Sequence, residues 1–237
     1  MKVKAGGKWG AGLTRFKRQG SWIKPRSTWQ KDGSKWLKVG VNYYLEENKL
    51  RHYATGLAVA QHYDPNTSLG LNAKERTLSG RDCVDFIDKG WIKMTDVQLP
   101  AKWTINLWYY PRNFQDYHHF FTYSGFQTNF TFKLSPTYPG RPYIHFNGKS
   151  YHGVDLLNDT GWNMVTLSYD GSIFRIYVNG HLSVKHTLTY AVPFGNYLCG
   201  SFGEEEAGEK NVGLVSDLVI YNKTLVQSEI DELYANW

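Results

Sequence analysis

Two carboxylates near the end of the sequence, Glu229 and Asp231, have the residue types that glycoside hydrolysis requires. Retaining hydrolysis uses two carboxyl groups about 5 Å apart, one as nucleophile and one as acid and base. Alternate residues of a strand could supply such a pair, because their side chains share one face. The segment from Ser228 to Tyr234 instead favours a short closing helix, with Ser228 as its cap and acids in its first turn. Hydrolysis at these carboxylates is therefore disfavoured.

Histidines and acids elsewhere in the sequence raise the question of a metal site. His118 and His119 follow Asp116, but neighbouring residues of a strand point to opposite faces and do not easily reach one ion. An exposed loop flanked by aromatic residues is the favoured interpretation of this segment. An acidic loop is formed by Glu204, Glu205, Glu206 and Glu209. Its carboxylates could hold calcium or could be solvated, so the sequence predicts no cofactor and leaves calcium open.

Aromatic residues that could bind a sugar gather near three prolines in the middle of the sequence. They are Tyr138, Tyr143, Tyr151 and His152. Such rings can stack on a sugar, although aromatic residues at the edge of a sandwich also serve as packing. We take these four as the candidate ligand-binding residues. The sequence contains no glycine-rich phosphate loop, no zinc-binding spacing and no Ser-His-Asp arrangement in a recognisable context.

The composition favours strands over helices. Aromatic residues make up 16% of the 237 residues, and they are enriched in strands. No run approaches the roughly 18 apolar residues of a membrane helix, and Met1 is followed by Lys-Val-Lys-Ala-Gly-Gly rather than by an apolar signal core. We therefore expect a soluble chain without a membrane span or signal peptide. Cys83 and Cys199 lie in strand-like pieces, where reduced, packed thiols are favoured and a disulfide stays open.

Positive charge is concentrated in the first 40 residues. This segment holds 11 of the 27 Lys and Arg residues and one of the 21 acids, which gives it a net charge of +10 and leaves −4 for the rest. It also contains Trp9, Trp22, Trp29 and Trp36, which need a further surface to pack on. The charge could neutralise phosphate, an anionic membrane surface or an acidic protein. An ordinary first hairpin of the main domain is the alternative.

From about residue 50, short β-like runs alternate with turn residues. Strands are predicted at 91–94, 103–109, 119–123, 130–134, 143–146 and 214–221. Residues 162–187 predict a three-stranded antiparallel meander. Its two turns, Asp170-Gly171 and Asn179-Gly180, favour type I′ geometry with positive φ at both central residues. Strands and turns at this spacing are typical of a sandwich or jelly roll.

Five pieces, in this order, resemble the successive strands of laminin G-like domains of the concanavalin A-like jelly roll. They are residues 80–86, 103–111, 161–171, 174–180 and 213–225. The resemblance covers about residues 50–237 and implies two curved antiparallel sheets, with carbohydrate or protein ligands at the concave face or rim. Ser216, followed by Asp217, stands where the family often has an acid, which weakens the inference of a metal site. Hydrolases of this fold carry a Glu-Ile-Asp-Xaa-Glu strand, but here Leu233 replaces the second glutamate.

The first 40 residues resemble the basic segments, with Gly and Trp, that fix an outward-facing domain to a tailed-bacteriophage particle. Trp9, Trp22 and Trp36 carry this resemblance. It implies a non-enzymatic virion protein of the tail, fibre or capsid surface, oligomeric in the particle. Residues 1–45 would attach to other virion proteins. Residues 46–237 would form an all-β, two-sheet antiparallel jelly-roll sandwich with a short C-terminal helix.

The jelly roll would contact a host-surface glycan or protein, and nucleic acid is not expected as a partner. A free lectin-like protein and a divergent glycoside hydrolase are the alternatives.

Overall fold

The computed structural model divides the chain into two compact units, Met1–Ala60 and Gln61–Trp237. The residues that it describes are 2–5, 8–11, 16–18, 21–23, 28–32, 35–39, 43–46, 49–52, 59–62, 73–79, 81–86, 91–97, 99–115, 117–123, 130–146, 148–188, 195–200 and 213–235. Among them, no helix has the length and apolar character that crossing a membrane requires.

The first unit contains four antiparallel hairpins, each a separate two-stranded sheet. The hairpins are β1 (Lys2–Ala5) with β2 (Lys8–Ala11), β3 (Phe16–Arg18) with β4 (Ser21–Ile23), β5 (Thr28–Asp32) with β6 (Lys35–Val39), and β7 (Tyr43–Glu46) with β8 (Lys49–His52). A further strand, β9 (Val59–His62), lies where the two units meet in the sequence. The boundary expected between residues 45 and 46 stays a prediction, and both residues lie on β7, which pairs with β8.

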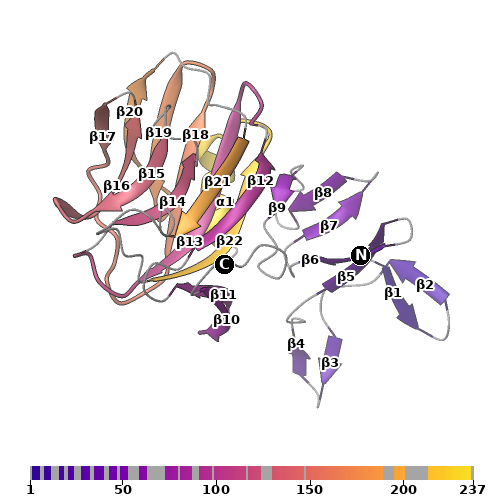
Figure 1. The fold of residues 1–237 in the computed structure, drawn as a ribbon. Helices are drawn as coiled ribbons and strands as arrows, with labels where there is room; N and C mark the ends of the chain where they lie inside the picture. Colours follow the sequence, from indigo (N-terminus) through magenta and orange to yellow (C-terminus); the bar gives the residue numbers. More distant parts are fainter. Residues whose placement is uncertain are drawn as a thin grey trace. The chain divides into compact units, whose positions relative to one another are not determined.

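The second unit is a two-sheet antiparallel jelly-roll sandwich closed by one helix, as the sequence predicts (Figure 1). The larger sheet has the strand order β10 (Ala73–Leu78), β11 (Arg81–Phe86), β22 (Gly213–Tyr221), β13 (Trp103–Pro111), β18 (Asn163–Tyr169), β19 (Ile173–Val178) and β20 (His181–Thr187). The smaller sheet has the order β12 (Trp91–Val97), β21 (Gly195–Gly200), β14 (His118–Tyr123), β15 (Thr131–Ser135), β16 (Tyr138–Phe146) and β17 (Lys149–His152).

The five segments that resemble laminin G-like strands form adjacent strands of the larger sheet. They contribute β11, β22, β13, β18 and β19, which are neighbours in the sheet order. Their alternating apolar residues enter one core, as expected for strands with one buried face. On β13, for example, Ile105 and Leu107 are fully buried in the core cluster.

Trp103 at the start of β13 is the central side chain of this core. Its ring lies 6.1 Å from Phe130, 5.9 Å from Tyr169 and 5.8 Å from Phe174, measured between centroids. Phe130 directly precedes β15 of the smaller sheet, whereas Tyr169 and Phe174 belong to the larger sheet. The indole therefore joins the two sheets, and aromatic contacts of this kind each add about 0.5–1.5 kcal/mol to the gain from burial.

The two predicted hairpin turns differ in geometry. At Asn179-Gly180 both residues have positive φ, 50° and 86°, which confirms the expected geometry there. At the first turn only Gly171 has positive φ, and the loop between β18 and β19 is one residue longer than the type I′ turn allows. The prediction was wrong there because the carboxylate of Asp170 organises a three-residue loop.

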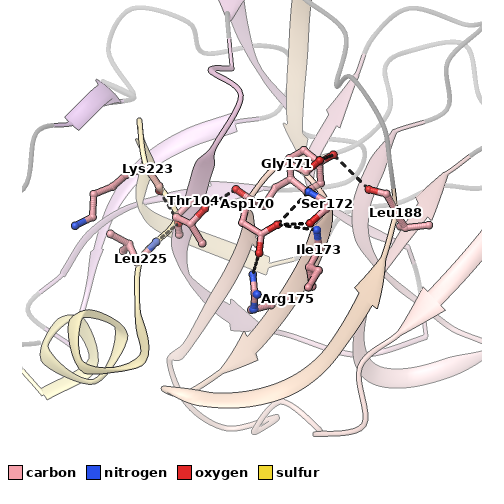
Figure 2. Close-up of polar contacts among 11 residues, drawn as sticks. Thr104, Asp170, Gly171, Ser172, Ile173, Arg175, Leu188, Lys223 and Leu225 are labelled. Carbon is pink, nitrogen blue, oxygen red and sulfur yellow. Dashed lines mark hydrogen bonds and ion pairs between the residues drawn. The ribbon is translucent and has the colours of Figure 1, made fainter.

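Asp170 collects four hydrogen-bond donors within this loop (Figure 2). Its Oδ1 accepts from the amide and hydroxyl of Ser172, both at 3.0 Å, and from the amide of Ile173 at 2.9 Å. Its Oδ2 lies 2.8 Å from the guanidinium of Arg175. Partial burial opposes ionisation, but these hydrogen bonds outweigh it and lower the pKa of Asp170 from 3.8 to about 2.

The C-terminal segment packs on the outer face of the larger sheet, which is the face turned away from the core. Thr104 of β13 donates its hydroxyl to the carbonyl of Lys223 at 3.0 Å and accepts the amide of Leu225 at 2.9 Å (Figure 2). The helix α1 (Gln227–Ala235) follows, and the ring of Tyr234 stacks on Trp108 at 5.9 Å.

The predicted cap of this helix was wrong. Ser228 lies inside the helix, and Glu229 instead accepts the amide of Val226 at 3.0 Å, because a glutamate at the third helical position can reach back to the residue before the helix.

Asp170 should stabilise the fold in a pH-dependent way. Because its pKa is lower in the folded state, the ionised carboxylate stabilises the fold above pH 4, and this contribution is lost as the pH falls toward 2. We expect Asp170→Asn to lower the free energy of unfolding by roughly 1–2 kcal/mol at pH 7 and by much less near pH 2, as measured by urea denaturation. The exposed Asp159→Asn is the control, and a deficit that does not change with pH would contradict the prediction.

Candidate functional site

Three of the four candidate ligand-binding residues form one aromatic cluster, which we call the aromatic platform. It consists of Tyr138 and Tyr143 of β16 and His152 of β17. The ring of His152 lies 4.2 Å from that of Tyr138, tilted by 53°, and 4.6 Å from that of Tyr143, nearly parallel at 22°. Because β17 is the last strand of the smaller sheet, the platform lies at the edge of that sheet.

Strand alternation places the platform on the outer face of the smaller sheet. Ile144 and Phe146 enter the core, so their neighbours Tyr143 and His145 face away from it. Tyr143 is the direct cross-strand partner of His152, which brings the two rings to the same face.

Tyr151 is separated from the platform by the same alternation. Its side chain packs against the core, and its ring lies 4.8 Å from that of His186 in the other sheet. Tyr138 is the first residue of β16.

The three platform residues differ in exposure in a way that suits a binding surface. Tyr143 is 5% exposed and lies beneath its neighbours, whereas Tyr138 is 46% exposed. His152 is intermediate. A buried ring thus supports two rings that solvent can reach, and an accessible aromatic ring such as that of Tyr138 suits the C–H face of a sugar.

Two residues that the sequence did not single out, Lys133 and Tyr117, lie next to the platform. Lys133 of β15 is the cross-strand partner of Tyr143, so Lys133, Tyr143 and His152 follow one another across three strands. The ammonium of Lys133 lies 4.4 Å from the ring centroid of Tyr117, a cation–π distance. On the same face, Nδ1 of His145 lies 3.0 Å from the hydroxyl oxygen of Ser150.

The histidines of this face favour their neutral form. Burial lowers the pKa of His152 below 6.5, and the charge of Arg141 lowers it further. Burial and the charge of Lys133 have the same effect on the pKa of His145. In His152, Nδ1 is buried with no hydrogen-bond partner among the described residues, so a proton there would lack an acceptor. At neutral pH the positive charge near the platform therefore comes from its neighbours Lys133 and Arg141.

His118 and His119 are buried, and the expectation of an exposed loop was wrong. Both lie on β14 with at most 1% exposure, because the strand begins one residue earlier than predicted and faces the protein on both sides. Nδ1 of His118 lies 2.5 Å from the hydroxyl oxygen of Tyr109, and Nδ1 of His119 lies 2.7 Å from that of Thr122.

The described residues contain no group of three or more His, Cys, Asp or Glu side chains that could hold a metal ion. Asp116 lies outside the described residues. So does the acidic loop, which consists of Glu204, Glu205, Glu206 and Glu209. On β22, the hydroxyl of Ser216 donates to Asp217 at 2.5 Å. Asp217 has a positive φ of 50°, and the pairing of β22 with β13 shifts register in this region.

The two carboxylates considered for hydrolysis stabilise the start of α1. Glu229 lies 2.6 Å from the ammonium of Lys223 through Oε1 and accepts the amide of Val226 through Oε2. Asp231 accepts the side-chain amide of Gln227 at 2.7 Å.

Cys83 lies on β11 of the larger sheet and donates its thiol to the carbonyl of Arg76 at 3.2 Å, while Cys199 lies on β21 of the smaller sheet.

The four candidate attachment tryptophans lie on hairpin strands of the first unit, although their side chains are outside the described part of the structure. The strand register makes each of them the direct cross-strand partner of a lysine. The pairs are Trp9 with Lys4, Trp22 with Lys17, Trp29 with Lys38, and Trp36 with Lys31. The sequence showed basic residues near each tryptophan, but the pairing itself depends on where each hairpin turns.

Comparison with known proteins agrees with the fold. The family model described as "Concanavalin A-like lectin/glucanases superfamily" matches residues 88–231. Among solved structures, the chain is similar to domain 4 of AbnA, a GH43 extracellular arabinanase from Geobacillus stearothermophilus, solved with arabinotriose. The TM-score is 0.58 and the identity 15%, over 70% of this chain and 82% of that one. No curated protein sequence matches the chain.

Two toxin domains have a similar fold. The ligand binding domain of botulinum neurotoxin serotype D, solved with N-acetylneuraminic acid, gives a TM-score of 0.53 at 14% identity, over 81% of this chain and 49% of that one. The binding domain of Paraclostridial Mosquitocidal Protein 1 gives 0.56 at 12% identity, over 82% and 51%. The chain thus spans about half the length of these toxin domains.

The electrostatic coupling of His152 to Arg141 can be measured directly. Because a neighbouring cation disfavours the charged imidazole, Arg141→Gln should raise the pKa of His152, though not fully to 6.5, since the burial remains. NMR titration of the histidine ring protons measures this pKa. Lys185→Gln, on β20 of the other sheet, is the control. An unchanged midpoint in Arg141→Gln would contradict the proximity of the two charges.

Proposed function

Because the chain belongs to the concanavalin A-like lectin/glucanases superfamily, we propose that its second unit binds carbohydrate at the aromatic platform and does not cleave it. The observation that carries the proposal is the cluster of Tyr138, His152 and Tyr143, which leaves aromatic surface open at a sheet edge of a lectin-type sandwich. The solved arabinanase domain and the toxin domain, bound to arabinotriose and to N-acetylneuraminic acid respectively, support carbohydrate as the ligand class.

The contacts of the carboxylates support binding without hydrolysis. Both oxygens of Glu229 are engaged, one with Lys223 and the other with the amide of Val226, and Asp231 accepts a hydrogen bond from Gln227. Glu229 and Asp231 therefore stabilise the N-terminus of a helix. They are not positioned as a nucleophile and an acid on either side of a glycosidic bond. The platform itself contains tyrosine and histidine but no carboxylate.

The first unit supports a finer proposal, that the protein is a structural component of a tailed-bacteriophage virion and is attached through residues 1–45. The charge of +10 over residues 1–40 suits an acidic protein surface. Isolated two-stranded hairpins are at best marginally stable in water, so the three hairpins that lie wholly within residues 1–45 gain from a partner surface. Tryptophans paired with lysines supply both apolar area and charge for such a contact. In this proposal the protein is located in the virion, with other virion proteins as partners and several copies per particle.

The alternative is a free lectin-like protein, for which the same platform would serve and the hairpins would have no structural partner. Calcium is not needed for sugar stacking on aromatic rings, so the proposed binding requires no cofactor.

Carbohydrate binding should depend on Tyr138. On a glycan array, we expect Tyr138→Ala to reduce binding at least tenfold, because the variant loses the most exposed ring of the platform. Tyr234→Ala is a matched control, since Tyr234 is 43% exposed and lies on α1, where it stacks on Trp108 of the larger sheet. Mass spectrometry of the bound saccharide should recover it intact. Equal loss in both variants, or a cleaved saccharide, would refute this part of the proposal.

Attachment should depend on the hairpins. A chain without residues 1–45 should keep the circular dichroism spectrum of a folded β-sandwich but should no longer sediment with particles from an infected culture. Replacing Trp9, Trp22, Trp29 and Trp36 together by Ser in the full chain should reproduce the defect while retaining the basic charge. Incorporation of the truncated chain at the level of the full one would exclude these residues as the anchor.

A further inference from the structure

Four strands of the smaller sheet form a region without acidic residues. From Tyr117 to Val154 the sequence contains no Asp or Glu, whereas it contains Lys133, Arg141 and Lys149 and four histidines. This stretch includes β14, β15, β16 and β17. It contrasts with the chain after residue 40 as a whole, whose net charge is −4. These four strands thus have a local positive charge inside a negatively charged unit, and Asp155, the next acid along the chain, lies in a segment that pairs with β16.

Two of these cations belong to the surroundings of the platform. Lys133 is the cross-strand partner of Tyr143. Arg141 lies on β16 two residues before Tyr143, so strand alternation turns both side chains to the same face, and the charge of Arg141 acts on His152. Arg141 makes no ion pair among the described residues, although Arg112 pairs with Asp85 at 2.7 Å. Arg175 likewise pairs with Asp170 at 2.8 Å. Arg141 is partly exposed, so an anion can approach it from outside.

We propose that the saccharide bound at the platform is acidic, with its ring against Tyr138 and His152 and its carboxylate, sulfate or phosphate group paired with Arg141 and Lys133. This inference rests on the proposed carbohydrate binding and adds the chemical class of the ligand. Aromatic rings alone accept many sugars, because every pyranose offers a C–H face. The positive charge of Arg141 and Lys133 distinguishes acidic from neutral sugars, which stacking on a ring does not.

The geometry of the two cations suits this task. A guanidinium presents a planar fork of donors that matches a carboxylate or phosphate, and a lysine supplies a point charge on a flexible stem. A neutral sugar adds no charged contact to either cation, whereas an acidic sugar gains charge-assisted hydrogen bonds. For partly exposed groups this difference corresponds to roughly tenfold in affinity.

The test compares acidic saccharides with their neutral counterparts. The full chain is applied to an array that pairs sialylated, uronic-acid-containing, sulfated and phosphorylated glycans with the same glycans lacking the acidic group. The dissociation constants of the best pair are then measured by calorimetry. We expect the acidic member to bind roughly tenfold more tightly, and we expect its advantage to shrink as NaCl is raised, because salt screens the charges.

Variants separate the charge from the ring. Arg141→Gln and Lys133→Gln should each weaken binding of the acidic glycan severalfold and binding of the neutral counterpart much less, whereas Tyr138→Ala should weaken both equally. Lys185→Gln on β20 is the control for a lysine lost from the other sheet. Thermal denaturation checks that each variant is folded.

The outcomes distinguish this inference from the proposed function. Equal affinity for both members of each pair, with no effect of Arg141→Gln, overturns the acidic ligand and leaves carbohydrate binding intact. No binding to any glycan overturns both. A single-stranded oligonucleotide that binds as tightly as the acidic glycan, and equally well to Tyr138→Ala, would show a general polyanion surface and would also overturn the inference.

Discussion

The register of the strands around the aromatic core is the constraint on which the second unit depends. Trp103 meets Phe130 from the facing sheet, and this contact fixes which face of each sheet is turned inward. Because side chains alternate along a strand, a shift of one residue would move every inward side chain to solvent. Burial of Phe132 and Ile144 therefore forces Lys133 and Tyr143 outward, side by side on adjacent strands. The platform is a consequence of how the core is packed.

The outer faces of the two sheets are used in different ways. On the larger sheet, the hydroxyl of Thr166 donates to Asn106 at 2.6 Å, and the C-terminal segment covers Thr104 and stacks on Trp108. Arg81 lies over the same indole at 4.0 Å, and burial lowers its pKa to about 10. Polar partners, a cation and a helix thus occupy that face. The platform of the smaller sheet lies instead at a sheet edge, with Tyr138 exposed. This difference is a physical reason to place the binding site on the smaller sheet.

The sequence predicted the larger sheet much better than the site. Apolar residues alternate along β13, β18 and β19, and short turns join β18 to β19 and β19 to β20, so this part of the pattern is local and can be read along the chain. The site is not local: Lys133 lies beside Tyr143 only because of the register of β15 on β16.

The sequence also did not predict the burial of the two histidines of β14, because that burial depends on what packs on each side of the strand. The turn at Asp170 was misassigned because a side chain, and not backbone preference alone, organises it. Tyr138, Tyr143 and His152 could be predicted as candidates from their residue types, but only the structure separates them from Tyr151.

The openness of the platform connects the two proposed roles of the chain. A surface at a sheet edge, with one ring 46% exposed, covers only part of a sugar, and such limited burial gives low affinity for one copy. Weak sites become effective when many are displayed together, because after the first contact each further one is intramolecular. An attachment segment that fixes many copies to one particle would present many platforms together. The hairpins are suited to such attachment. A shallow platform is therefore more useful on an anchored protein than on a free monomer, which favours the attached form over a free monomeric lectin.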